Sequence, residues 1–343
     1  MNRIRCCLLA VLVVSPFASC DMGFDIPPVL SKDKDLLELL SIARDIDADS
    51  ATRYTAIEPI IARARKAGET DWLCSLLGEM LEAHPDDPYG SYYLMAMAEG
   101  AKDTGSQELS LDYLRRLTRN FPDIEIKGQS LHLLALDEIA RHSTEPREAI
   151  AVRIRMQQNY SAHIDQGRNY YALAEEYEKI GLWDDMYKAY AEFLKFPEAV
   201  IPGLPNVRKK VSSDITFHNS DKHWTVDNLD ELVDMVQYAI RTQDPRLLVH
   251  YQSSEFFLMN WSQETSDAFT HIPMELGTFL KSSVRYRPEL EPFSNDREAF
   301  LWTTGWSWKM PTWYLYFRRV DYPADPEING RWEWVGIYFG ERL

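Results

Sequence analysis

The sequence predicts an α+β protein, in which an all-α N-terminal part precedes a C-terminal α+β domain with an antiparallel sheet. Between residues 33 and 197, apolar side chains recur at helical spacing and strand patterns are scarce. After residue 293, short runs rich in tryptophan and tyrosine alternate as strands do. The chain has 343 residues, more than a typical single domain, so two domains are expected.

The first twenty residues have the pattern of a secretion signal. Arg3 and Arg5 precede an apolar run over residues 6–14, and Pro16 interrupts its continuation. The run is about half as long as a membrane-spanning helix, which needs about 20 residues. We therefore expect a signal peptide over residues 1–20.

The end of this segment, Phe17-Ala18-Ser19-Cys20, resembles the lipobox of bacterial lipoproteins, although that family usually has leucine in place of Phe17. The resemblance implies that Cys20 carries the lipid and becomes the first residue of the mature chain. Residues 21–32 would then be a tether. The expected location is a bacterial cell membrane, lipid-anchored, on its periplasmic or extracytoplasmic face.

Composition argues against nucleic acid as a partner. The formal net charge is −16, and loss of Arg3 and Arg5 with the signal would change it to −18. No segment is basic enough to predict a phosphate-binding face. Because anionic headgroups repel so acidic a chain, the lipid is expected to supply the membrane affinity. Cys74, the one cysteine outside the signal and lipobox, lies in an apolar helical series and is expected in the core.

Successive helix patterns fill residues 33–197, each bounded by Gly, Pro, Asp or Asn. The clearest of these patterns cover residues 92–100, 109–117, 131–140, 146–156, 170–181 and 182–197.

Residues 170–197 resemble the tetratricopeptide repeat (TPR), a 34-residue helix-turn-helix unit. The residues on or next to its signature positions are Leu173, Ala174, Tyr177, Gly181, Trp183, Tyr190 and Pro197. Met186 and Phe193 depart from the pattern, since the family prefers alanine there. From Pro85 to Pro122 is 37 residues, and from Pro122 to Pro197 is 75, close to twice that spacing. The resemblance implies three to four TPR-like repeats. Together with the lipobox, it implies that the chain is similar to the TPR lipoproteins of the bacterial envelope.

Proline and glycine between residues 198 and 224 predict a linker, so the C-terminal domain is expected at residues 225–343. Thr225 is the expected N-cap of an amphipathic helix, and Asp244-Pro245 is expected to begin a short one. The expected strands are Trp306–Trp308, Trp313–Arg318 and Arg331–Phe339, and the turn signal Asn329-Gly330 lies between the last two.

Signatures of catalysis and of metal binding are weak. The sequence has no nucleophile elbow, phosphate-binding glycine loop or zincin helix. His218 and His223, with Asp214 and Asp221 nearby, lack the helical spacing of a zinc site. The acidic residues between 321 and 329 do not follow an EF-hand order. No metal, cofactor or enzymatic activity is expected, although two carboxylates that meet only in the fold would indicate a hydrolase.

These observations favour a non-catalytic interaction scaffold that binds another envelope protein through its repeats. The partner-binding residues are expected among the tyrosine pairs Tyr92/Tyr93 and Tyr170/Tyr171, with one member of each pair in the core and the other free. The alternative is a solute- or glycan-binding lipoprotein with an aromatic platform in its C-terminal domain. The residues of that platform would be Trp306, Trp308, Trp313, Trp332 and Trp334.

Overall fold

The structure is a computed structural model that describes residues 26–261 and 276–342. Over these residues it combines helices and sheet, with thirteen α-helices and one five-stranded sheet. The chain divides into two compact units, and the boundary in the sequence lies between Ile164 and Asp165. Helices α8 (Gln166–Lys179) and α9 (Trp183–Phe193), which the sequence groups with the preceding helices, belong by their contacts to the second unit.

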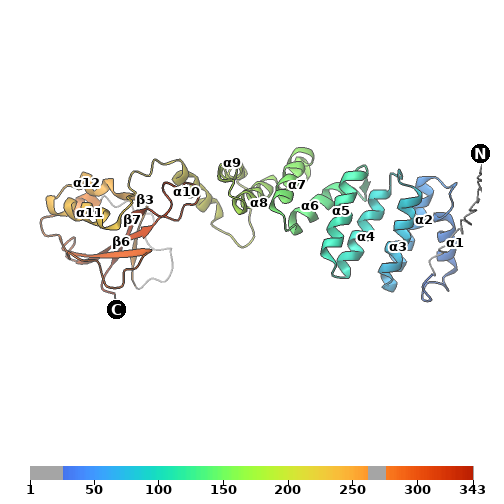
Figure 1. Ribbon diagram of the computed structural model, residues 1–343, viewed down its shortest axis with the longest axis horizontal. Helices are drawn as coiled ribbons and strands as arrows, with labels where there is room; N and C mark the ends of the chain where they lie inside the picture. The colour runs from blue at the N-terminus through green and yellow to red at the C-terminus, as the bar shows by residue number, and fades with distance from the viewer. Residues whose placement is uncertain (1–25, 262–275, 343) are drawn as a thin grey trace, which may run out of the picture. The chain divides into compact units, whose positions relative to one another are not determined.

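The first unit is helical. Its helices are α1 (Lys34–Ala43), α2 (Ser50–Ala67), α3 (Thr70–Ala83), α4 (Gly90–Asp103), α5 (Gln107–Asn120), α6 (Leu131–His142) and α7 (Pro146–Asn159). Each packs against the next in the chain, and α4 also contacts α6 (Figure 1). A small hairpin of β1 (Glu125–Ile126) and β2 (Gln129–Ser130) precedes α6, and a 3₁₀ turn, η1 (Ser161–His163), follows α7.

Local sequence explains where these helices begin and end. Asp33, Asp49 and Ser130 act as N-caps, each accepting a hydrogen bond of 3.0–3.1 Å from the backbone N–H three residues later. Pro146 occupies the first turn of α7, where a missing N–H costs nothing. Gly68 ends α2 with a φ of 78°, a conformation that other residues adopt rarely.

The second unit contains six α-helices in its described part. They are α8 (Gln166–Lys179), α9 (Trp183–Phe193), α10 (Val207–Asn219), α11 (Leu229–Thr242), α12 (Pro245–His250) and α13 (Leu276–Phe279). Its strands are β3 (Gln252–Asn260), β4 (Arg285–Tyr286), β5 (Glu298–Thr304), β6 (Thr312–Arg319) and β7 (Trp332–Phe339), in the spatial order β3-β7-β6-β5-β4.

The expected antiparallel sheet is wrong at one edge, because β3 pairs with β7 in parallel. The other pairs are antiparallel, so the sheet is mixed. The long chain between β3 and β7 makes a parallel pairing possible, since it serves as the crossover that a hairpin cannot provide. Gly336 leaves room on β7 for the Phe257 ring, which would lie 2.8 Å from a β-carbon there.

Residues 198–224, which were expected to form a linker, include the helix α10. This helix buries Val207 and Val211, and the Arg208 guanidinium donates hydrogen bonds of 2.7 and 2.9 Å to the carbonyls of Leu194 and Phe196. The N-cap of α11 is Asn228 rather than Thr225. Asp244 caps α12, as expected.

The strand predicted at Trp306–Trp308 is also wrong, because β5 ends at Thr304. Gly305 follows with a φ of 86° and turns the chain where a β-carbon would collide with the Ser283 carbonyl. The other two predicted strands correspond to β6 and β7.

Candidate protein-interaction surface

One face of the first unit is formed by α2, α4 and α6, and we call it the α2/α4/α6 face. On α4, Tyr92, Met95, Glu99 and Lys102 recur every three or four residues and so share one side of the helix. The two aromatic and apolar members are half-buried, and the two charged members are exposed. Tyr92 and Met95 pack against the core with part of their surface, and the rest of the stripe faces outward.

A groove lies in this face where α4, α5 and α6 meet. Its apolar lining is Met95, Ala98, Leu114 and Leu134, and its charged lining is Glu99, Lys102, Glu138 and Arg141. Its volume of about 190 Å³ is below the roughly 300–1,000 Å³ of small-molecule sites. The groove therefore suits a single apolar side chain of another protein better than a whole ligand.

Ion pairs join alternate helices along this face. Arg65 of α2 pairs with Glu99 of α4 and with Asp103, the latter at 2.9 Å. Lys102 of α4 pairs with Glu138 of α6 at 2.7 Å. Burial would raise the pKa of Glu138, but the hydrogen bond and charge of Lys102 outweigh it, so this pKa is lowered. The rim of the groove is thus charged and held in place.

Three tyrosines gather beside α4. The Tyr54 ring stacks on Tyr89 with centroids 4.4 Å apart and meets the edge of Tyr92 at 5.1 Å. Burial raises the pKa of Tyr92 to about 12, so its hydroxyl is neutral at ordinary pH. Lys127 lies 3.5 Å from Glu58 of α2. The cluster offers aromatic surface with hydrogen-bonding hydroxyls, a combination enriched at interfaces.

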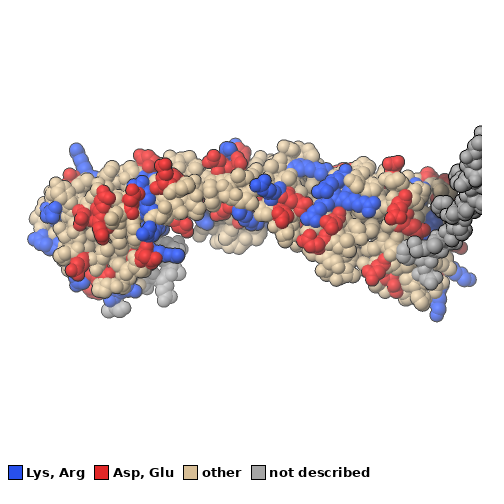
Figure 2. All heavy atoms as spheres, in the orientation of Figure 1, with Lys and Arg blue, Asp and Glu red and all other residues tan. Residues whose placement is uncertain are grey.

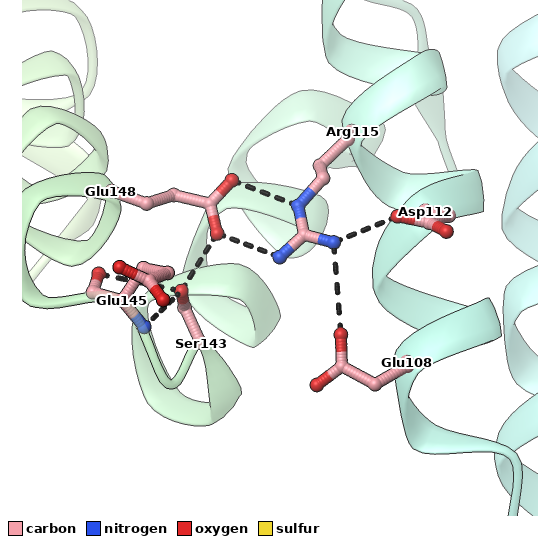
Figure 3. Close-up of polar contacts among 6 residues, drawn as sticks. All are labelled: Glu108, Asp112, Arg115, Ser143, Glu145 and Glu148. Carbon is pink, nitrogen blue, oxygen red and sulfur yellow. Dashed lines mark hydrogen bonds and ion pairs between the residues drawn. The ribbon is translucent and has the colours of Figure 1, made fainter.

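A second set of contacts fixes α5 against α7. Arg115 reaches from α5 and donates two hydrogen bonds of 2.8 Å to the Glu148 carboxylate of α7 (Figure 3). Ser143 donates to the same carboxylate at 2.7 Å. The bidentate geometry fixes orientation as well as distance. Acidic and basic groups are interleaved on the surface over the region of α5–α7 (Figure 2).

The tyrosine pairs divide between core and surface. Tyr93 is 1% exposed and Tyr171 is 8% exposed, whereas Tyr92 and Tyr170 are half-buried. Tyr92 lies on the α2/α4/α6 face, and Tyr170 packs against the Phe196 ring in the second unit. Their role in binding stays a prediction.

The predicted tryptophan platform is not formed as one exposed surface. Trp306, Trp313, Trp332 and Trp334 are at most 4% exposed, and Trp308 alone of the five is open, at 87%. The indole rings of Trp306 and Trp313 stack at 5.0 Å inside the unit. Alternation failed as a guide here because both faces of the sheet are covered, one by each of two apolar clusters.

A polar cavity of about 250 Å³ in the second unit contains several carboxylates, among them Asp214, Glu255 and Glu333. Burial raises the pKa of Asp214, and Glu255 acts in the same direction. Glu333 is 1% exposed and accepts hydrogen bonds of 2.8–3.0 Å from Trp224, Ser253 and Arg318. Glu333 therefore has a structural role, and Asp214 is a carboxyl of this cavity whose pKa is raised by burial.

The histidines weighed as metal ligands have other partners. The His218 ring stacks on Tyr187 at 3.9 Å and hydrogen-bonds the Tyr322 hydroxyl, and His223 lies 2.7 Å from Asp221. Residues 26–261 and 276–342 contain no cluster of three or more potential metal ligands. Cys74 is half-buried against the core of the first unit, and burial raises the pKa of its thiol.

The predicted lipidation site, Cys20, lies outside the described residues, as does the whole signal segment. None of the helices in the described ranges has the length and apolar character needed to cross a membrane. No model of a known protein family matches the chain, and a search of curated proteins finds no significant relative.

Sequence reasoning missed the groove residues Met95, Leu134 and Glu138. A signal was present, because Arg65 and Lys102 are 37 residues apart, the same spacing as the prolines that close the helical segments. Aligning the segments at that offset places these charges at equivalent positions on α2 and α4. The helix faces around them then become candidates for a continuous surface.

Proposed function

We propose that the protein is a membrane-anchored, non-catalytic scaffold of the bacterial cell envelope that binds another envelope protein through TPR-like repeats. The observation that carries this proposal is the groove on the α2/α4/α6 face, with its apolar floor and charged rim. An apolar side chain of the partner would enter between Met95 and Leu134. The charged rim would contact the flanking residues of the same segment.

The spacing of polar contacts supports the repeat interpretation. Within the first unit, residues 33 to 38 positions apart are joined repeatedly across neighbouring helix pairs. These contacts are Arg44–Glu79, Arg53–Asp87, Arg65–Glu99, Arg65–Asp103, Lys102–Glu138, Arg115–Glu148, Arg155–Thr118 and Tyr160–Asp123. A helix-turn-helix repeat of about 34 residues brings such positions together in each successive unit. In such a stack the first helix of each repeat, here α2, α4 and α6, lines the binding surface.

The anchor in this proposal is the lipid on Cys20, which rests on the resemblance of residues 17–20 to a lipobox. Two acyl chains bind a membrane far more firmly than one, because each buried methylene contributes about 0.8 kcal/mol. A lipid-held scaffold would present its helical face to partners in the envelope and would need no membrane-crossing helix for that purpose.

Site-specific photocrosslinking in cells tests the groove. A photoreactive residue in place of Leu134, which is 38% exposed in the groove, should give a discrete crosslinked product. Leu109 on α5 is a matched control, since it is a leucine of the same unit, 46% exposed, and does not line the groove. The product should be absent when the crosslinker replaces Leu109. Equal products from both positions, or none from Leu134, would contradict the proposal.

A second candidate, an envelope hydrolase, is favoured by one observation, the raised pKa of Asp214 beside Glu255 in the cavity of the second unit. Two carboxylates that line one cavity are the kind of pair from which a hydrolase can build its acid and its base. Incubation of the full chain with purified peptidoglycan would test it. Release of soluble fragments by the native chain, lost on Asp214→Asn and kept on the surface change Asp234→Asn, would favour the hydrolase over the scaffold.

A further inference from the structure

A separate pocket in the second unit has a basic lining. It lies between the C-terminal end of α11, the turn before β4, and β4 itself, and its volume is about 300 Å³. Its charged lining residues are Arg241, Lys281 and Arg285, which come from these three segments. Gln243, Ser282 and Tyr286 add side chains that can donate hydrogen bonds. Among the residues that the structure describes, the lining contains no carboxylate.

The ion pairs formed by the described residues do not include these three cations. Within the described ranges, Arg241, Lys281 and Arg285 form no ion pair with any Asp or Glu. Arg285 donates from Nη1 to the carbonyls of Ser282 and Val284 at 2.7 and 2.8 Å, which orients its guanidinium and leaves its other N–H groups for a ligand. The chain as a whole is acidic, with a formal net charge of −16, whereas this pocket is locally basic.

Two features oppose an anion here, and both are weak. The C-terminal end of α11 carries the negative end of the helix dipole, about half a unit charge. Gln243 and Asp244 donate their backbone N–H groups to carbonyls of that last turn, which reduces this effect further. The Asp244 carboxylate accepts hydrogen bonds from the N–H groups of Arg246 and Leu247 at 2.9 and 3.1 Å. Three full positive charges outweigh these contributions.

An exposed aromatic loop is attached to the same turn. Ser283 donates to the carbonyl of Gly305 at 2.8 Å, and the N–H of Gly305 donates to the carbonyl of Pro311 at 3.1 Å, closing a loop over residues 305–311. Trp308 in this loop is 87% exposed, and the Lys309 ammonium lies 5.4 Å from the centre of its ring. Exposed tryptophan beside basic residues is typical of surfaces that enter the headgroup region of a membrane.

We propose that this pocket binds a phosphate group, and that the group is the headgroup phosphate of an anionic lipid, with Trp308 inserted beside it. Guanidinium and ammonium groups around a cavity of this size match a phosphate in charge and in hydrogen-bond donors. The overall repulsion between an acidic chain and an anionic membrane does not prevent this contact, because charges beyond about 8 Å are screened at physiological salt. The site would add an orienting contact to the proposed scaffold, and it does not depend on that function.

Vesicle co-sedimentation of the full chain tests the proposal, with Cys20→Ala included so that no acyl chain contributes. The protein should sediment with vesicles that contain phosphatidylglycerol and not with vesicles of phosphatidylcholine alone. Replacing Arg241, Lys281 and Arg285 together by glutamine should weaken binding about a hundredfold, since each basic residue near an anionic surface contributes about 1 kcal/mol. A control that replaces Lys32, Lys34 and Lys66 by glutamine makes the same change in net charge and should bind normally.

A titration with inorganic phosphate distinguishes the lipid from a free solute. Trp308→Ala should weaken binding to the vesicles and leave phosphate binding unchanged, which supports the lipid as the source. Phosphate binding without any binding to vesicles would overturn the lipid assignment. If neither probe binds, or if the control triple variant loses as much as the pocket triple variant, the phosphate site itself is refuted.

Discussion

Replacing Arg115 by alanine should weaken the packing of α7 against α5. The loss of stability should be larger than the loss caused by removing an ordinary exposed charge. The two hydrogen bonds from Arg115 to Glu148 are both 2.8 Å, and the side chains are 21% and 23% exposed. Exposed ion pairs contribute about 0.2–1 kcal/mol, and hydrogen bonds to charged groups about 1.5–3 kcal/mol. With partial solvent screening, we expect a loss of about 1–2 kcal/mol, which corresponds to a factor of about 5–30 in an opening equilibrium.

Amide hydrogen exchange of the full chain measures this loss locally. Backbone amides of α7 should exchange faster in Arg115→Ala by about that factor, because the helix opens more often when the clamp is missing. Amides of α11, in the other unit, should be unaffected. Hydrogen exchange suits a chain of two units better than a global unfolding curve, which assumes a single transition.

Arg116→Ala is the matched control, since Arg116 is exposed on the same helix and forms no ion pair or hydrogen bond with the residues described. A double-mutant cycle with Glu148→Gln then isolates the pair. The reasoning is refuted if α7 exchanges at the native rate in Arg115→Ala, if Arg116→Ala has the same effect, or if the two single effects simply add.

Four further predictions concern the anchor, the packing, the titration of the clamp and the tyrosines. Cys20→Ala should leave the exported protein unprocessed or soluble, and membrane fractionation after a high-salt wash checks this. Ala174→Trp should destabilise the second unit by roughly 1–3 kcal/mol, since Ala174 is fully buried, and an unchanged melting temperature would contradict that. The pKa of Glu148 is lowered from 4.5, chiefly by its hydrogen bond with Arg115. The stabilising contribution of Glu148 should therefore be complete above pH 4.5 and be lost as the pH falls through the lower pKa of the folded state. Hydrogen exchange of α7 across that pH range measures this loss. Tyr92→Ala combined with Tyr170→Ala should weaken capture of the crosslinked partner by more than about 2 kcal/mol with the fold intact, and undiminished affinity would place the contact elsewhere.

Helices were predictable from the sequence because each carries its own signals. The apolar stripe of α11, from Leu232 to Ile240, is local in sequence, so no knowledge of the fold is needed to find it, although the predicted cap was three residues too early. The start of α7 at Pro146 follows for the same reason. The α10 helix was missed because it follows a stretch rich in proline and glycine and buries few apolar residues.

The sheet depended on information that is not local. Strand β3 has the irregular burial pattern of a strand with a register shift, and its partner lies far along the chain. In β6, six successive residues from Thr312 to Phe317 are buried, so alternation could not tell an exposed face from a core face. The groove and the basic pocket each draw side chains from three segments, and only the fold brings those together.

The parallel pairing of β3 with β7 has a consequence for how the second unit is assembled. During synthesis β3 emerges well before β7, and between Asn260 and Trp332 the ribosome must add β4, β5 and β6. Strand β7 also lies between β3 and β6, so β3 cannot pair with the sheet until β7 has been synthesised. Pairings of such high sequence separation form slowly and leave an edge open to other chains. Until β7 has been synthesised, β3 therefore has an unpaired edge, and a chaperone would be expected to protect it.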